Sequence, residues 1–241
     1  MSRNGGKDGG SVLRVRIARP VDRPAPADTR ASVCRFCPSA LTSAESQPLP
    51  VRSPAQLVLL ARDAWEDGLA RMWLTAEVPD DVPHYVRAVR DDVPGMRVAV
   101  DCGPADACVL HQLRTAGVTD VGIHIGSLDD DVRARDSDAE AVPLSGYERA
   151  WDEAVRVFGR YRVTTCLVVG AGENPGDLVS GAARLIARGV QPVVVPYRAG
   201  TDALVRWAGQ AVADMLRTVG AGNSSGAGSS STATGPHPII T

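Results

Sequence analysis

The sequence has few aromatic residues, no excess of basic side chains and no long apolar run, and each absence narrows what the chain can be. Aromatic residues make up 4% of the 241 residues, so the core must consist mainly of Val, Leu, Ile and Ala. The longest apolar runs, such as residues 57–61, fall far short of the roughly 20 residues that a membrane-spanning helix needs. A formal net charge of −2 gives no basic surplus for nucleic acid. We therefore expect neither a membrane nor a nucleic-acid partner.

The start of the sequence carries no recognisable targeting signal. Residues 1–10 are polar and rich in glycine, and no apolar stretch follows them. Hydrophobic residues make up 44% and charged residues 22% of the chain, which is typical of a globular protein. We expect a cytoplasmic protein with a flexible tail at residues 1–10, one domain at residues 11–219 and a disordered Gly/Ser/Thr-rich tail at residues 220–241.

Within residues 11–219, short aliphatic strands alternate with helices. The predicted strands are residues 12–17, 71–76, 97–101, 120–125, 163–169 and 192–196, and the predicted helices are residues 54–68, 82–90, 104–116, 145–158, 175–188 and 202–219. Ser53 before Pro54 is a helix-start signal, while Gly117 and Gly189 are helix-stop signals. This alternation is typical of βαβ units and predicts an α/β protein with a parallel sheet, either open and doubly wound or closed into a whole or partial barrel. In both cases the chemistry lies at the carboxyl ends of the strands.

Five cysteines, an odd number in a chain without a secretory signal, argue against a disulfide framework. Cys34 and Cys37 form a CxxC motif in the loop after the first strand, a spacing that suits zinc, an iron–sulfur cluster or a redox pair. Cys102 ends the third strand and Cys108 lies in the following helix. Cys166, inside a strand, is most simply a small buried apolar residue.

The loop that holds this CxxC resembles the radical S-adenosylmethionine (radical SAM) superfamily, whose usual motif is CxxxCxxC with an aromatic residue, here Phe36, before the last cysteine. Residues 74–77 fall where that family has its Gly-Gly-Glu segment, and residues 168–173 resemble its later glycine-containing strand end. Residues 116–125 and 189–198 look most like bacterial members found in nitrilase-associated gene clusters. The resemblance implies a parallel partial (β/α)6 barrel of the TIM-like, radical SAM type.

The same resemblance implies a 4Fe-4S cluster with Cys34 and Cys37 among its ligands. Arg30 stands where the first cysteine of the motif belongs, so the third ligand must come from elsewhere. Cys102 is the better substitute, and Asp22 or Asp28 is an oxygen alternative. Cys102 and Cys108 are also candidates for a second, auxiliary iron–sulfur cluster or for holding the substrate.

S-adenosylmethionine is the second cofactor that the resemblance implies. By the same comparison Phe36 lies near its adenine and Glu77 binds its amino group. Ser127 contacts its ribose or carboxylate, and the glycines at 170 and 172 allow the backbone to approach the adenosine. These residues are the cofactor-binding candidates, namely Phe36, Glu77, Ser127, Gly170 and Gly172.

The implied activity is reductive cleavage of S-adenosylmethionine to a 5′-deoxyadenosyl radical, which abstracts hydrogen from a small-molecule substrate of bacterial specialised metabolism. An electron donor such as flavodoxin or ferredoxin is then required. Rearrangement, oxidation and sulfur insertion are all compatible outcomes.

A second interpretation is a degenerate barrel that acts as a non-catalytic binding or partner subunit, or that holds zinc through Cys34, Cys37, Cys102 and Cys108.

Two further features have alternative interpretations. His124 occupies an alternating position of a strand, so it is either a hydrogen-bonded core histidine or a substrate contact. The acidic run at residues 129–131 resembles the charged start of a helix more than a metal site.

Overall fold

The computed structural model of the chain describes residues 13–17, 51–75, 82–136, 142–197 and 201–220. Its strands are β1 (Leu13–Ile17), β2 (Val51–Arg52), β3 (Arg71–Thr75), β4 (Arg97–Cys102), β5 (Asp120–Ile123), β6 (Val163–Val169) and β7 (Val190–Pro196). Its helices are α2 (Pro54–Glu66), α3 (Val82–Asp92), α4 (Ala107–Ala116), α5 (Asp130–Asp136), α6 (Leu144–Phe158), α7 (Pro175–Arg188) and α8 (Asp202–Thr218). Of the two predicted tails, residues 1–10 and 221–241 lie outside the described residues.

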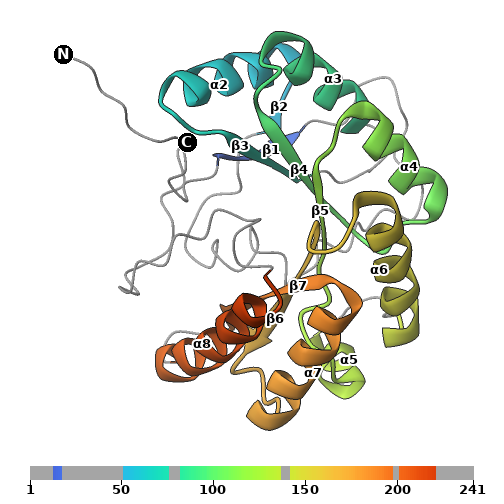
Figure 1. Cartoon of the computed structure of the whole chain (residues 1–241), viewed down its shortest axis with the longest axis vertical. Coiled ribbons are helices and arrows are strands. Elements are labelled where there is room, and N and C mark those ends of the chain that lie inside the picture. The colour runs from blue at the N-terminus through green and yellow to red at the C-terminus, as the bar shows by residue number, and fades with distance from the viewer. Residues whose placement is uncertain (1–12, 18–50, 76–81, 137–141, 198–200, 221–241) are drawn as a thin grey trace.

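The strands form one parallel sheet in the order β2-β1-β3-β4-β5-β6-β7. From β1 onward each long strand lies beside the preceding long strand, without the reversal of strand order that an open doubly wound sheet shows. Figure 1 shows the sheet curled into an arc with the helices along its outer side. The predicted partial (β/α)6 barrel is thus confirmed, and the doubly wound alternative is wrong.

The structure differs from the predicted elements mainly at their ends. The two-residue strand β2, which pairs with β1, was not predicted because two residues carry no periodicity. Helix α4 begins at Ala107 rather than at residue 104, since the Asp106 carboxylate accepts the Val109 N–H at 2.9 Å and caps the helix there. The acidic run does start a helix, the seven-residue α5.

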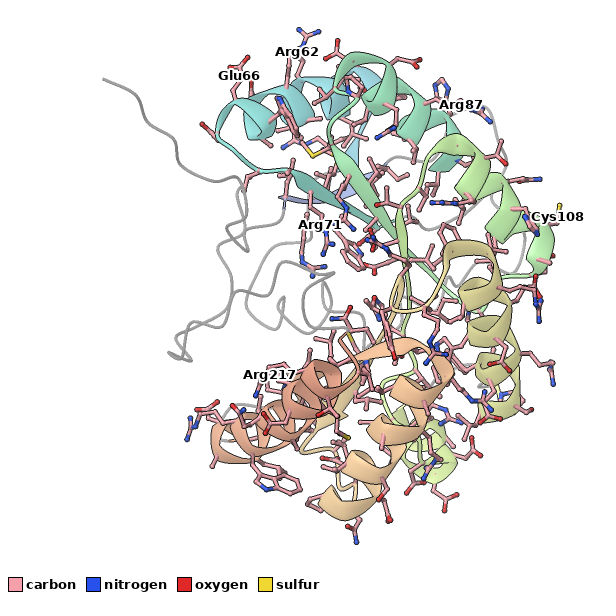
Figure 2. All side chains as sticks on the ribbon, in the orientation of Figure 1. Arg62, Glu66, Arg71, Arg87, Cys108 and Arg217 are labelled. Carbon is pink, nitrogen blue, oxygen red and sulfur yellow. The ribbon has the colours of Figure 1, made fainter. Side chains whose placement is uncertain are left out.

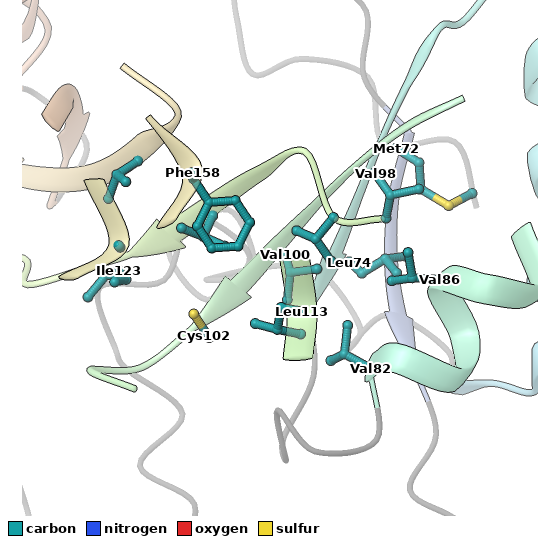
Figure 3. Close-up of a cluster of buried hydrophobic side chains, with 14 of the residues drawn as sticks. Met72, Leu74, Val82, Val86, Val98, Val100, Cys102, Leu113, Ile123 and Phe158 are labelled. Atoms are coloured by element: carbon teal, nitrogen blue, oxygen red, sulfur yellow. The ribbon is translucent and has the colours of Figure 1, made fainter. Parts of the chain in front are cut away.

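The hydrophobic core lies between the sheet and its helices. Successive side chains of a strand point to opposite faces, and in the central strands one set consists of apolar residues that pack against the helices. Met72 and Leu74 of β3 and Val98 and Val100 of β4 are fully buried in this way, and Leu113 of α4 packs among them (Figure 3). Aliphatic residues therefore supply the core that the scarcity of aromatics predicts.

Two interactions fix β5 within the sheet. At its amino end the Asp120 carboxylate pairs with Arg97 at 3.2 Å and with Arg162 at 3.3 Å, which ties together the starts of β4, β5 and β6. At its carboxyl end the Trp151 indole N–H of α6 donates to the carbonyl of Ile123 at 3.0 Å. These contacts set the height and direction of the strand whose end carries His124.

The predicted helix stops are confirmed. Gly117 and Gly189 follow α4 and α7 with φ angles of 102° and 93°, in the left-handed region that other residues adopt at a cost. None of the helices in the described ranges is long and apolar enough to cross a bilayer.

The packing of α2 generates a prediction with an internal control. Leu57 is fully buried against the sheet, whereas Leu59 of the same helix is 57% exposed. We expect Leu57→Ala to lower the free energy of unfolding by about 2 to 5 kcal/mol, because it removes apolar contacts and leaves a cavity. Leu59→Ala should change it by less than about 0.5 kcal/mol in urea denaturation. Equal losses in the two variants would contradict the packing described.

Candidate functional site

The face of the sheet opposite the helices carries a set of polar residues from neighbouring strands. Strand alternation puts them there, because their described neighbours along each strand belong to the helix-facing core. We call this set the concave cluster. Its members are Arg14 of β1, Trp73 and Thr75 of β3, Asp101 of β4 and His124, which follows β5.

The centre of the concave cluster is a hydrogen bond between His124 and Asp101. The Nε2 atom of His124 lies 2.6 Å from Oδ1 of Asp101, and both side chains are about 6% exposed. The Thr75 hydroxyl donates to the other carboxylate oxygen at 3.1 Å. The backbone N–H of Cys166 in β6 donates to Nδ1 of His124 at 3.2 Å. One chain of hydrogen bonds therefore connects β3, β4, the end of β5 and β6.

These contacts determine which nitrogen of His124 carries the proton. Because Nδ1 accepts the Cys166 N–H, it is unprotonated, and Nε2 is the atom that donates to Asp101. Burial lowers the pKa of His124, but the Asp101 carboxylate outweighs burial and raises it above its ordinary value. A second proton would have to go to Nδ1, where it would break the Cys166 hydrogen bond. The raised pKa therefore favours the imidazolium, while this backbone hydrogen bond from β6 favours the neutral ring.

Opposing effects also act on the pKa of Asp101. Burial by itself raises the pKa of this carboxyl group, but the charge and hydrogen bond of His124, the charge of Arg14 and the indole of Trp73 together bring the pKa below its ordinary value. The Asp101 carboxylate is therefore held ionised inside the protein.

Room for the pair comes from Gly122 of β5. A Cβ atom at this position would lie 2.4 Å from Oδ1 of Asp101 and 2.7 Å from Nε2 of His124, closer than real Cβ contacts allow. The hydrogen bond between the two side chains therefore requires glycine at position 122.

Arg14 and Trp73 form the other half of the concave cluster. The two residues are paired across β1 and β3, and the Arg14 guanidinium carbon lies 5.4 Å from the centre of the Trp73 rings. That distance is typical of a cation–π contact. The Nη1 atom of Arg14 and the indole nitrogen of Trp73 are buried, and neither makes a hydrogen bond to any residue that the structure describes.

Ser127, a predicted cofactor contact, lies buried in the loop between β5 and α5. Its hydroxyl accepts the Asp129 N–H at 3.1 Å, and its carbonyl accepts a hydrogen bond from the buried guanidinium of Arg133 at 2.7 Å. Ser127 therefore organises the loop at the carboxyl end of β5. Its predicted contact with S-adenosylmethionine stays a prediction.

Gly170 and Gly172 lie in the loop after β6 with φ angles of 98° and 105°. The Glu173 carboxylate accepts the N–H groups of Gly170 and Ala171 at 2.5 and 2.8 Å, so these donors are already occupied within the protein. A Cβ atom at position 170 would lie 2.4 Å from the Thr201 methyl group. The glycine at 170 is thus required by packing, whether or not an adenosine approaches it.

The two candidate thiols of the described residues have different surroundings. Cys102 is 7% exposed and packs in the helix-facing core (Figure 3), where burial first, and the charge of Asp101 second, raise the pKa of its thiol to about 12. Cys108 is exposed on α4, on the outer side of the arc (Figure 2), and accepts a weak hydrogen bond from Gln112. Neither environment favours a metal-bound thiolate at the concave face.

The remaining predicted site residues, Cys34, Phe36, Cys37 and Glu77, lie outside the described residues, as do the alternative ligands Asp22 and Asp28. Among the residues that are described, no three His, Cys, Asp or Glu side chains converge in a way that would hold a metal ion. The described strands therefore offer no metal centre of their own, and the cluster prediction depends on Cys34 and Cys37.

The strand pattern in the sequence points to His124 but not to its partners. Both interpretations of His124 required an inward side chain, and the structure confirms that orientation together with the hydrogen-bonded state. Asp101, Arg14 and Trp73 were missed, although strand alternation with their apolar neighbours was a usable signal. What alternation does not give is the pairing across strands, which depends on their register.

Comparison with solved structures identifies the same architecture elsewhere. Methylornithine synthase (PylB) superposes with a TM-score of 0.61 at 13% identity, over 89% of this chain and 64% of that one. The FeFe-hydrogenase maturase HydG from Carboxydothermus hydrogenoformans superposes with a TM-score of 0.60 at 14% identity, over 86% of this chain and 52% of that one. The radical S-adenosylmethionine methyltransferase TsrM from Kitasatospora setae superposes with a TM-score of 0.51 at 14% identity, over 79% of this chain and 36% of that one.

At these identities the likeness establishes the fold, a partial (β/α)6 barrel of the radical SAM type. The chain spans less than two thirds of the length of each of these three proteins. No model of a protein family and no curated protein matches the sequence.

The space above Gly122 provides a test of the Asp101–His124 pair. We expect Gly122→Ala to destabilise the protein by about 2 kcal/mol or more, because the added methyl group displaces two buried polar side chains. The deshielded Nε2 proton of His124 should disappear from the proton NMR spectrum. Gly103→Ala is the matched control, since a Cβ at position 103 meets no described residue within 4 Å. Retention of the proton signal in Gly122→Ala would contradict the geometry.

The lowered pKa of Asp101 predicts a dependence of stability on pH. A carboxyl group whose pKa is lower in the folded than in the unfolded protein stabilises the fold above its unfolded pKa of about 3.9, and this contribution is lost as the pH falls through the folded value. We expect the stability advantage of the natural protein over Asp101→Asn to be greatest near neutral pH and to shrink below about pH 4. Urea denaturation across a pH series measures it, and a difference independent of pH would refute the ionised state.

Proposed function

We propose that the chain is a radical SAM enzyme that acts on a small molecule bound at the concave face of the sheet. The observation that carries the proposal is the buried polar cluster at the carboxyl ends of β3 to β6, inside a fold of the radical SAM type. Chemistry in parallel α/β barrels takes place at this end of the strands. Polar side chains held rigidly on strands are suited to positioning a substrate.

The proposed cofactors are a 4Fe-4S cluster and S-adenosylmethionine. Such a cluster, when bound, supplies the electron that cleaves S-adenosylmethionine to methionine and a hydrogen-abstracting 5′-deoxyadenosyl radical. Cys34 and Cys37 are its proposed ligands, supported by their CxxC spacing after β1. Cys102 and Cys108 lie in surroundings that support neither a third ligand nor an auxiliary cluster, so we include neither thiol in the proposed ligand set.

The concave cluster and the loops next to it then have distinct tasks. Asp101 and His124 form a closed hydrogen-bonded pair whose inner surface bounds the substrate and keeps water from the reacting carbon. Arg133 and Ser127 fix the loop after β5, and Glu173 fixes the loop after β6, so both loops present defined backbone at the mouth. Specialised bacterial metabolism, and an electron donor such as flavodoxin or ferredoxin, remain parts of the proposal that follow from the sequence resemblance.

A second candidate function is a barrel without the cluster that serves as a binding subunit or holds zinc. One observation favours it, namely that the motif provides two thiols instead of three and the described strands add no suitable third ligand. Metal content after anaerobic purification separates the candidates. Iron and sulfide near four per chain support the enzyme, while zinc or no metal supports the alternative.

The ligand assignment predicts how cysteine variants behave after anaerobic reconstitution. Cys34→Ser and Cys37→Ser should each lose most of the iron and all formation of 5′-deoxyadenosine from S-adenosylmethionine and dithionite, because the motif holds the metal. Cys102→Ala and Cys108→Ser should keep the iron content of the natural protein. Iron analysis and chromatographic detection of 5′-deoxyadenosine measure both effects. Natural protein that carries its full iron content but forms no 5′-deoxyadenosine would refute the proposal that the chain is an enzyme.

A further inference from the structure

Two buried donors on the concave face make no hydrogen bond within the described part of the chain. Trp73 is only 8% exposed, and its indole nitrogen is buried without a hydrogen-bond partner. The guanidinium of Arg14 lies over the Trp73 ring, and its Nη1 atom is likewise buried without a hydrogen bond to a described residue. Both residues face away from the helices because Leu13 and Val15, and Met72 and Leu74, occupy the helix-facing side. The two donors therefore share one part of the concave face, two residues before the level of Thr75 and Asp101 in the register of the strands.

Unsatisfied buried donors are unusual, because a buried N–H that loses its bond to water normally gains one in the protein. Trp151 shows the ordinary case, since its indole N–H donates to the carbonyl of Ile123 at 3.0 Å. Asp101, the acceptor in the concave cluster, already receives hydrogen bonds from Thr75 and His124. Arg14 and Trp73 also lie close enough to Asp101 to lower its pKa, but among the described residues neither Nη1 of Arg14 nor the indole nitrogen of Trp73 has a partner in hydrogen-bond geometry.

We propose that Arg14 and Trp73 bind the carboxylate group of the substrate, which is therefore a small organic acid. A planar carboxylate has two oxygens, which match the edge of a guanidinium and leave an acceptor for the indole N–H. Asp101 already offsets part of the charge of Arg14, so a singly charged carboxylate meets less repulsion there than a dianion such as phosphate. Trp73 holds the guanidinium in place by stacking. The inference names the substrate class of the proposed enzyme and in that respect rests on the proposed function.

The experiment observes the Trp73 donor directly. Tryptophan labelled with ¹⁵N in the full-length protein gives four indole signals, from Trp65, Trp73, Trp151 and Trp207, and Trp73→Phe identifies the one of interest. The protein is titrated with acetate and benzoate, and in parallel with acetamide and benzamide, to about 10 mM, which nearly fills a site with a Kd of about 1 mM. We expect the Trp73 proton to move downfield and saturate with the acids and to stay in place with the amides. Trp151 should not respond to either series.

Arg14 variants test the second donor. Arg14→Gln should abolish the acid-dependent shift of Trp73, and Arg14→Lys should weaken acid binding about tenfold because lysine keeps the charge but loses the planar fork. The unchanged signals of the other tryptophans show whether each variant is folded. Inorganic phosphate is expected to shift Trp73 less than acetate does.

The proposal is overturned if Trp73 does not move with either acid, or if it moves equally with acids and amides. The titration needs neither the cluster nor S-adenosylmethionine, so it is independent of the test of radical chemistry. Acid binding without 5′-deoxyadenosine formation would refute the enzyme and keep the acid site, whereas the reverse result would refute the acid site alone.

Discussion

The two-residue period of a β-strand is the constraint on which this structure depends. In a parallel sheet covered by helices on one face, each strand sends one set of side chains into an apolar core and the other set toward the concave interior. Apolar residues such as Val98 and Val100 meet the first requirement without difficulty. Polar residues in the second set must bond to one another or to something that binds there, because few of them reach bulk water. The concave cluster is the result of that requirement.

Within this cluster the Asp101–His124 hydrogen bond also fixes the positions of neighbouring strand ends. It joins the ends of two adjacent strands, and its extensions to Thr75 and to the backbone of Cys166 bring in the strands on either side. The loops that leave these strands therefore start from fixed positions. Breaking a buried pair of this kind leaves a charge or dipole unmatched, which is more costly than never having formed it. Glycine at position 122 is the structural condition for the pair.

Much of the fold could be predicted from the sequence because its determinants are local. Aliphatic runs, helix signals at Ser53 and Pro54, and stops at Gly117 and Gly189 located the long strands and helices to within a few residues. The choice between a barrel and an open sheet was not local, because it depends on which strand lies beside which. Motif resemblance to the radical SAM superfamily supplied that choice, and the strand order confirms it. The site was harder to predict from the sequence, because Asp101 and His124 are 23 residues apart and only the register of β4 and β5 brings them together.

Alternation also explains why sequence position alone is a poor guide to a ligand. Cys102 ends β4 and so lies where a barrel collects its chemistry, but Asp101 precedes it and faces the concave interior, so the thiol of Cys102 faces the helices. Two adjacent residues of one strand cannot both point inward. At the end of β4 the interior therefore receives a carboxylate, and that carboxylate is already bonded to Thr75 and His124. In the function proposed above, a metal cluster above these strands would therefore take its thiolates from the CxxC segment, and the strands themselves would hold and orient the substrate.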